Sequence, residues 1–197
     1  LENISALNNL TTIGGSVTIR ICDVLTSLNG LENLSAIGGK LLIERNPVLT
    51  DVLPLNNLNS INGSLNIRMC HALTDLLGLD SLTSINGFLS INNNNALISL
   101  SGIQNIDPNT IEHVSSSLPD LSIYNNPLLY ECEMQSICSF LPLPNKTFSI
   151  YNNATGCNSS SEIIAICSTL STNGQDYLSN KIIMHPNPSS SYIQVSG

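Results

Sequence analysis

The stretch LNNLNSINGSLNIRMCHAL, residues 55–73, contains the pattern that decides the fold. Polar and apolar residues alternate over residues 64–68, and this period of two predicts a β-strand whose inward side chains are Leu65 and Ile67. Gly63 opens the strand at a bend where a Cβ would clash. The Leu-x-x-Leu-x-x-Ile spacing ahead of the strand predicts the other sides of one coil.

The pattern recurs every 24 residues. Its first position is occupied by Leu7, Leu31, Leu55, Leu79 and Ile103. The strand part returns with altered spacing in residues 121–126 and 148–153. Equal spacing makes the strands parallel and in register, about 4.8 Å apart, and only the stacking of coils buries their apolar edges. The sequence therefore predicts a mostly β fold, a right-handed parallel β-solenoid of about six coils over residues 1–129.

The fifth coil is lengthened by residues 107–117. Pro108 follows Asp107, and apolar residues stand beyond it at spacings of three and four. This combination predicts a short helix within the lengthened segment.

One position of each coil is asparagine or cysteine. The column contains Cys22, Asn46, Cys70, Asn94, Asn126 and Asn153. A buried Asn amide both donates to and accepts from the backbone of a tight turn, so the column predicts a structural ladder in which cysteine acts as a small buried substitute. Cys22 and Cys70 lie two coils apart, about 9–10 Å, whereas a disulfide needs Cα atoms within about 7 Å. We therefore expect two free, buried thiols.

The composition excludes several classes of protein. The chain has 197 residues, with 6 Lys+Arg against 14 Asp+Glu and a net charge of −8, so it lacks the cationic surface that binds nucleic acid. Only 10% of the residues are charged, and 27 asparagines supply much of the polar surface instead. The apolar runs fall far short of the roughly 18 residues that span a bilayer, so we expect no transmembrane segment.

The repeat pattern Leu-x-x-Leu…Gly-x-Leu-x-Ile-x-x-(Asn/Cys)-x-x-Leu resembles the leucine-rich-repeat class. More closely, it resembles the receptor-L-domain-like repeats of secreted Bacteroidetes proteins, over residues 1–168. The chain departs from the standard leucine-rich repeat in having Leu/Ile-x-x-Ile-x-Gly ahead of the strand. From this departure we expect strands on more than one face of the solenoid and little helix.

Four cysteines follow the regular repeats and predict a cap over residues 130–168. Cys132, Cys138, Cys157 and Cys167 contain no Cys-x-x-Cys pair, which argues against a zinc site. The pattern Glu-Cys-Glu-Met-Gln-Ser-Ile-Cys resembles the cysteine-bearing cap of the same repeat family. Three connectivities are possible, and we favour Cys132–Cys157 with Cys138–Cys167, because this joins the short helices predicted over residues 133–141 and 163–170. Disulfides imply an oxidising compartment.

Beyond the cap, residues 169–180 are polar and predict a linker. Residues 181–197 contain Pro186-Asn187-Pro188, a short polar gap and an Ile-x-Val. This motif resembles the opening of the sorting domain of the Bacteroidetes type IX secretion system, and a plain proline turn is the alternative. The resemblance implies a truncated sorting domain, contact with the secretion machinery, and a secreted or outer-surface location. Because the chain begins within the repeat pattern, we expect a fragment.

No motif in the chain predicts chemistry. His71, His113 and His185 are scattered, and the pattern contains neither a phosphate loop nor a nucleophile motif. Asp51 and Asp75 share one column, but a calcium ladder would need acids in every coil. We therefore expect no catalytic residues, no metal and no cofactor.

The outward side of the strands carries the candidate binding face. One outward column contains Arg20, Glu44, Arg68, Asn92, Tyr124 and Tyr151, with Phe88 on the same face. The three charged residues are expected to pair as an exposed ladder worth roughly a few tenths of a kcal/mol per contact. The two tyrosines offer flat apolar rings with polar tips, which suit a sugar or a protein. The alternative is that they only cover the sheet near its cap.

These features favour a non-catalytic extracellular module for adhesion or for binding a protein or glycan ligand at the bacterial surface. A passive structural spacer, or an accessory region of a larger secreted protein, is the alternative. Ice binding would need a regular threonine row, which the central outward column lacks. That column contains Thr18, Leu42, Asn66, Ser90, Ser122 and Ser149.

Overall fold

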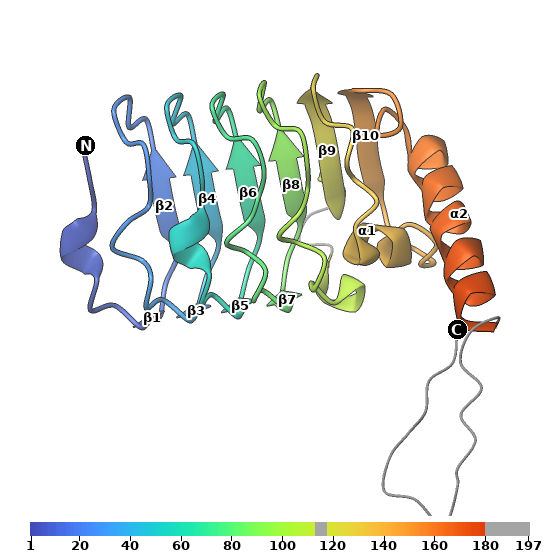
Figure 1. The fold of residues 1–197 in the computed structure, drawn as a ribbon. Helices are drawn as coiled ribbons and strands as arrows, with labels where there is room; N and C mark the ends of the chain where they lie inside the picture. The colour runs from blue at the N-terminus through green and yellow to red at the C-terminus, as the bar shows by residue number, and fades with distance from the viewer. Residues whose placement is uncertain (113–117, 180–197) are drawn as a thin grey trace, which may run out of the picture.

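The computed structural model describes residues 1–112 and 118–179 and shows a parallel β-solenoid (Figure 1). One face is a parallel six-stranded sheet in the order β10-β9-β8-β6-β4-β2. Its strands are β2 (Val17–Arg20), β4 (Leu41–Glu44), β6 (Leu65–Arg68), β8 (Leu89–Asn92), β9 (Leu121–Asn126) and β10 (Phe148–Asn153). The predicted stack of parallel coils is confirmed.

A second sheet forms another side of the coils, as expected from the Ile-x-Gly pattern ahead of each strand. It has four short strands in the order β1-β3-β5-β7. They are β1 (Thr12–Ile13), β3 (Ala36–Ile37), β5 (Ser60–Ile61) and β7 (Ser84–Ile85). The prediction of strands on more than one face is therefore confirmed.

The core lies between the sheets and is built by the inward columns. Ile43, Ile67 and Ile91 are direct partners in adjacent strands, and each is fully buried. Burial of one such side chain contributes about 1.5–3 kcal/mol. Because each coil contacts only its neighbours, this column joins the coils into one folding unit.

Within residues 1–112 and 118–179, three single turns of 3-10 helix interrupt the coils: η1 (Ser5–Leu7), η2 (Leu53–Leu55) and η3 (Pro108–Thr110). The helix predicted within residues 107–117 is therefore limited, in the described residues, to η3. Asp107 caps this turn by accepting from the Asn109 N–H. The helix stops because the chain is extended again at Ile111, which forms a parallel bridge with Gly87. Residues 113–117 lie outside the described part of the chain.

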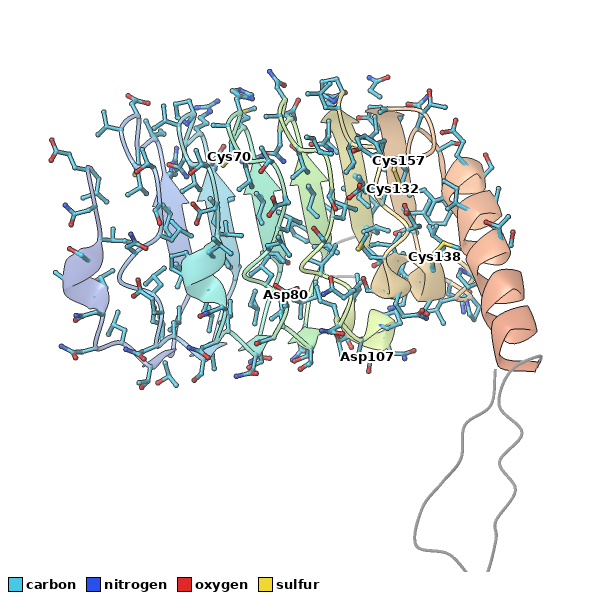
Figure 2. The ribbon with its side chains drawn as sticks, in the orientation of Figure 1. Cys70, Asp80, Asp107, Cys132, Cys138 and Cys157 are labelled. Atoms are coloured by element: carbon cyan, nitrogen blue, oxygen red, sulfur yellow. A yellow bond between two sulfur atoms is a disulfide. The ribbon has the colours of Figure 1, made fainter. Side chains whose placement is uncertain are left out.

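The C-terminal cap contains α1 (Gln135–Phe140) and α2 (Ser160–Ser179), and α2 covers the end of the solenoid (Figure 1). Disulfides join Cys132 to Cys157 and Cys138 to Cys167, with Cα atoms 5.9 and 5.7 Å apart. This is the pairing that the sequence favours among three, and Figure 2 shows Cys132, Cys138 and Cys157 gathered at this end. The helices bury Phe140 and Ile163 against the last coils, which closes the apolar face that a terminal coil would expose.

The helix α2 is longer than predicted, because it continues to Ser179 through most of the segment expected as a linker. Its start is capped by side chains: Ser159 Oγ accepts from the Glu162 N–H, and Glu162 accepts from the Gly156 and Asn158 N–H groups of the preceding loop. The Ser168 and Thr169 hydroxyls donate to carbonyls one turn back, so polar composition did not end the helix. The sorting-domain motif of residues 181–197 lies outside the described residues.

The long strands end in a strained turn that the predicted ladder supports. One residue per coil has a left-handed backbone with φ between 54 and 58°: Ile21, Arg45, Met69, Asn93, Asn125 and Asn152. This conformation disfavours non-glycine residues, a β-branched one such as Ile21 most of all. The ladder residue follows directly, and its backbone N–H is bonded by the ladder asparagine of the next coil in the turns at Ile21, Met69, Asn93 and Asn125.

Each ladder amide bridges two neighbouring coils. The Asn94 Oδ1 accepts from the Cys70 N–H at 3.0 Å, and its Nδ2 donates to the Ile67 carbonyl at 3.1 Å. Asn46, Asn126 and Asn153 each make the equivalent pair of bonds to the backbone of the preceding coil. Cys22 and Cys70 are free, buried thiols in the same column. The turn therefore leaves few buried backbone groups without partners.

A second tight turn depends on glycine. Gly78 has φ +106°, and a Cβ there would lie 2.4 Å from the Val52 carbonyl oxygen. Its N–H donates to Asp80, labelled in Figure 2, at 3.0 Å, and Gln104 of the next coil donates to the same carboxylate at 2.8 Å. These bonds, the Gly78 N–H foremost, lower the pKa of Asp80 below its ordinary value. Asp80 is therefore a structural turn acid.

The buried thiol of Cys70 should make the free energy of unfolding decrease as the pH rises above 9. Burial raises the pKa of this thiol from 9.0 to about 11. Between these values the unfolded chain ionises Cys70 while the folded chain does not. We therefore expect about 2–3 kcal/mol of stability to be lost as the pH rises from 9 to 11. Urea unfolding at pH 9 and pH 11 should show a smaller loss of stability in Cys70→Asn than in wild type, because the variant keeps a ladder residue but has no thiol there. An equal loss of stability in wild type and Cys70→Asn would contradict this prediction.

Candidate functional site

The candidate site lies on the outward face of the six-stranded sheet. Strand register places Arg20, Glu44, Arg68, Asn92, Tyr124 and Tyr151 side by side in this order. The column that the sequence singled out is thus continuous across all six strands.

The two tyrosines of this column stack on each other. Their ring centroids are 4.9 Å apart and their planes differ by 4°, a stacked geometry worth about 0.5–1.5 kcal/mol beyond burial. One face of each ring is therefore occupied by the other ring. Because Tyr124 lies on the β8 side of Tyr151, its remaining face is directed along the column toward Asn92.

A groove of about 330 Å³ extends from Arg68 past Asn92 to the tyrosine pair. Its polar lining comes from the outward positions of β6, β8, β9 and β10: Asn66, Ser90, Asn92, Ser122 and Ser149. Its apolar lining comes from Phe88, Leu118 and Pro119 beside the two rings. The groove therefore joins aromatic surface to a row of amides and hydroxyls.

The polar lining is largely pre-organised. Asn92 is only 3% exposed, and its amide donates to Ser90 Oγ at 2.9 Å and accepts from the Asn93 amide at 2.7 Å. Along the adjacent rim, the Asn152 amide donates to Asn125 Oδ1 and the Asn125 amide to Asn93 Oδ1. This second amide ladder was not predicted, although the repeated Tyr-Asn-Asn of the last two coils was its sequence signal.

Two polar atoms of lining residues have no hydrogen-bond partner in the described part of the chain. They are Asn66 Oδ1 and Arg68 Nε, and both are buried. A buried polar atom left without a partner costs about 1–3 kcal/mol. Such atoms therefore favour a ligand, or a side-chain rotation, that satisfies them.

The expected exposed charge ladder is wrong in two respects. Glu44 is 6% exposed rather than solvated, and Arg68 Nη2 donates to its Oε1 at 2.9 Å. Its second cationic neighbour is Arg45, whose Nε lies 4.0 Å away; within the described residues Arg20 forms no ion pair. Arg45 is the residue directly after Glu44 and has the left-handed backbone of the turn that ends β4.

The described residues were also compared with the requirements of a metal site, a histidine cluster and a membrane-spanning helix. Across residues 1–112 and 118–179 no group of three or more His, Cys, Asp or Glu side chains is arranged to hold a metal ion. His71 is an exposed turn residue, and His113 and His185 lie outside the described residues. Among the described helices, none combines the length and the apolar character needed to cross a membrane.

The stacked coils, the disulfide-bonded cap and the outward groove define a capped parallel β-solenoid. The family model of the Receptor L domain matches residues 57–166, more than half of the chain, so the chain belongs to that family. Searches of curated proteins and of solved structures find no significant match. Family membership and the two disulfides together indicate an extracellular ligand-binding module.

Proposed function

We propose that this chain is a non-catalytic binding module displayed at a bacterial surface, and that the groove between Arg68 and the tyrosine pair binds its ligand in adhesion. The observation that carries the proposal is the stacked Tyr124–Tyr151 pair beside buried, oriented polar groups. A pair that only covered the sheet would need no polar groove next to it. Binding sites combine apolar surface with a few fixed polar groups in this way.

Location at the cell surface is part of the proposal. The two cap disulfides fit an oxidising compartment. The resemblance of residues 181–197 to a type IX sorting segment, together with the Bacteroidetes-like repeat, supports export by that machinery followed by release or surface attachment. The ligand is then an extracellular glycan or protein.

The test compares the full chain with Tyr124→Ala/Tyr151→Ala in a screen against immobilised polysaccharides and extracellular proteins. The double variant should lose at least tenfold in affinity, about 1.4 kcal/mol, because the aromatic wall of the groove is removed. Tyr130→Ala is the matched control, since Tyr130 is 54% exposed but does not line the groove. Thermal unfolding of each variant verifies that the solenoid is intact.

Ligand binding that survives in the double variant would overturn the proposed site. Complete absence of binding by the folded wild-type chain would favour a passive spacer instead. Loss of binding in Tyr130→Ala as well would show that the effect is not specific to the groove.

A further inference from the structure

Resting on the proposed function, we infer that the groove takes an uncharged saccharide chain, and that Glu44 sets this preference by neutralising Arg68. The inference concerns the chemistry of the ligand and names a residue of the neighbouring strand β4 that acts on the groove through Arg68. It follows from the charge balance, the hydrogen-bonding groups and the backbone pairing of the groove.

The charge balance favours a neutral ligand. Arg68 is the only charged residue among the described residues that line the groove. Its guanidinium donates to Glu44 at 2.9 Å, and the Glu44 side chain is 8% exposed. The Arg68 side chain itself is 38% exposed, but its direct contact with this nearly buried carboxylate compensates the positive charge at short range. An acidic ligand would therefore find no free cation in the groove.

The hydrogen-bonding groups favour hydroxyls. Asn66 Oδ1 is an acceptor and Arg68 Nε–H is a donor, and neither has a partner in the described structure. A sugar hydroxyl donates and accepts, so it satisfies both kinds of group. Both atoms are covered by their neighbours, so the Asn66 amide must turn toward the groove to meet the ligand, and the Arg68 Nε–H becomes reachable only if the Arg68 side chain also shifts. Ser90, Ser122 and Ser149 continue the row of hydroxyl partners toward the tyrosines.

The backbone argues against an extended peptide. The strands β6, β8 and β9 each pair with a neighbour on both sides, so their backbone N–H and C=O groups are already used. A peptide that binds by adding a strand needs a free sheet edge, whereas the groove lies over the face of the sheet, and the cap with α2 follows the end strand β10 (Figure 1). A sugar ring needs only side-chain partners and an aromatic surface. The free face of Tyr124 supplies that surface at the end of the polar row.

The experiment measures a ratio of affinities. Titration calorimetry of the full chain with short galactan oligosaccharides and with oligogalacturonate, at low and at high salt, gives the preference for neutral over acidic sugar. In the wild-type chain the galactan should bind at least tenfold more tightly, with little dependence on salt. In Glu44→Gln the ratio should shift at least tenfold toward oligogalacturonate, and high salt should abolish that shift, because an unpaired Arg68 charge is now responsible.

The matched control is Glu44→Gln/Arg68→Gln, which removes both charges and should restore the wild-type ratio. Asn66→Ala should weaken galactan binding about fivefold or more, since it removes the unpartnered acceptor. Thermal unfolding shows whether each variant keeps the fold. If Glu44→Gln alone does not fold, the wild-type ratio and Asn66→Ala still test the preference for a neutral sugar.

Three outcomes overturn the inference. The first is a wild-type chain that binds oligogalacturonate as tightly as galactan, and the second is a ratio that Glu44→Gln leaves unchanged. The third is an acidic or peptidic ligand whose binding is lost in Tyr124→Ala/Tyr151→Ala. In that case the groove remains the binding site, and only the assignment of a neutral sugar fails. A ligand that does not depend on the tyrosines would reject the site itself.

Discussion

Replacing Ile67 by Asp should abolish the folded solenoid. Ile67 lies in the middle of β6, is fully buried, and packs in the column between Ile43 and Ile91. A carboxylate at this position would face apolar side chains of both neighbouring coils, and no cation lies in that column to pair with it. The expected loss is about 5 kcal/mol or more, comparable to the whole stability of many domains.

The measurement is circular dichroism combined with urea unfolding of purified Ile67→Asp. Ile67→Val is the matched control for shape and should cost only about 0.5–1.5 kcal/mol. Asn66→Ser, at the adjacent outward position and equivalent to Ser90 of the next coil, should leave stability within about 1 kcal/mol of wild type. An Ile67→Asp protein that unfolds cooperatively near the wild-type midpoint would contradict the stacked core.

Asn94→Ala should destabilise the solenoid by about 3–5 kcal/mol. The substitution removes the acceptor of the Cys70 N–H and the donor to the Ile67 carbonyl, both in a site with no solvent exposure. Each orphaned buried group costs about 1–3 kcal/mol. The left-handed turn at Met69, which these two bonds span, also loses the support that compensates its strain.

Urea unfolding should rank three variants. Asn95→Ala, an exposed neighbour, should match wild type within about 0.5 kcal/mol. Asn94→Cys should fall between wild type and Asn94→Ala, since Cys70 shows that a thiol occupies this column. Equal stability of Asn94→Ala and wild type would reject the ladder as a stabilising element.

The ladder and the tyrosine pair were accessible to sequence reasoning because they depend only on the repeat. A residue and its counterpart 24 positions later occupy the same place in adjacent coils, so column membership determines the neighbours. The longer strand segments of the last two coils keep the same pattern, which placed Tyr124 against Tyr151 despite the altered spacing.

The groove and its charge state were not accessible in this way. Leu118 and Pro119 line the groove because the lengthened fifth coil returns them to the strand face; a periodic pattern does not give the path of an insertion. Glu44 was expected in solvent, and its burial depends on where Arg45 and Arg68 direct their side chains. The disulfide pairing was one of three possibilities until α1 and α2 were placed beside each other.

By itself, the sequence determined the coil, its strands, its inward columns and the ladder, because each is a local pattern repeated at constant spacing and satisfied by its immediate neighbours. The tertiary structure alone decided the length of α2, the burial of Glu44 and the shape of the groove. These features arise where segments outside the regular repeat pack against the coils. Side-chain packing and charge compensation at such contacts depend on distances that sequence spacing does not contain.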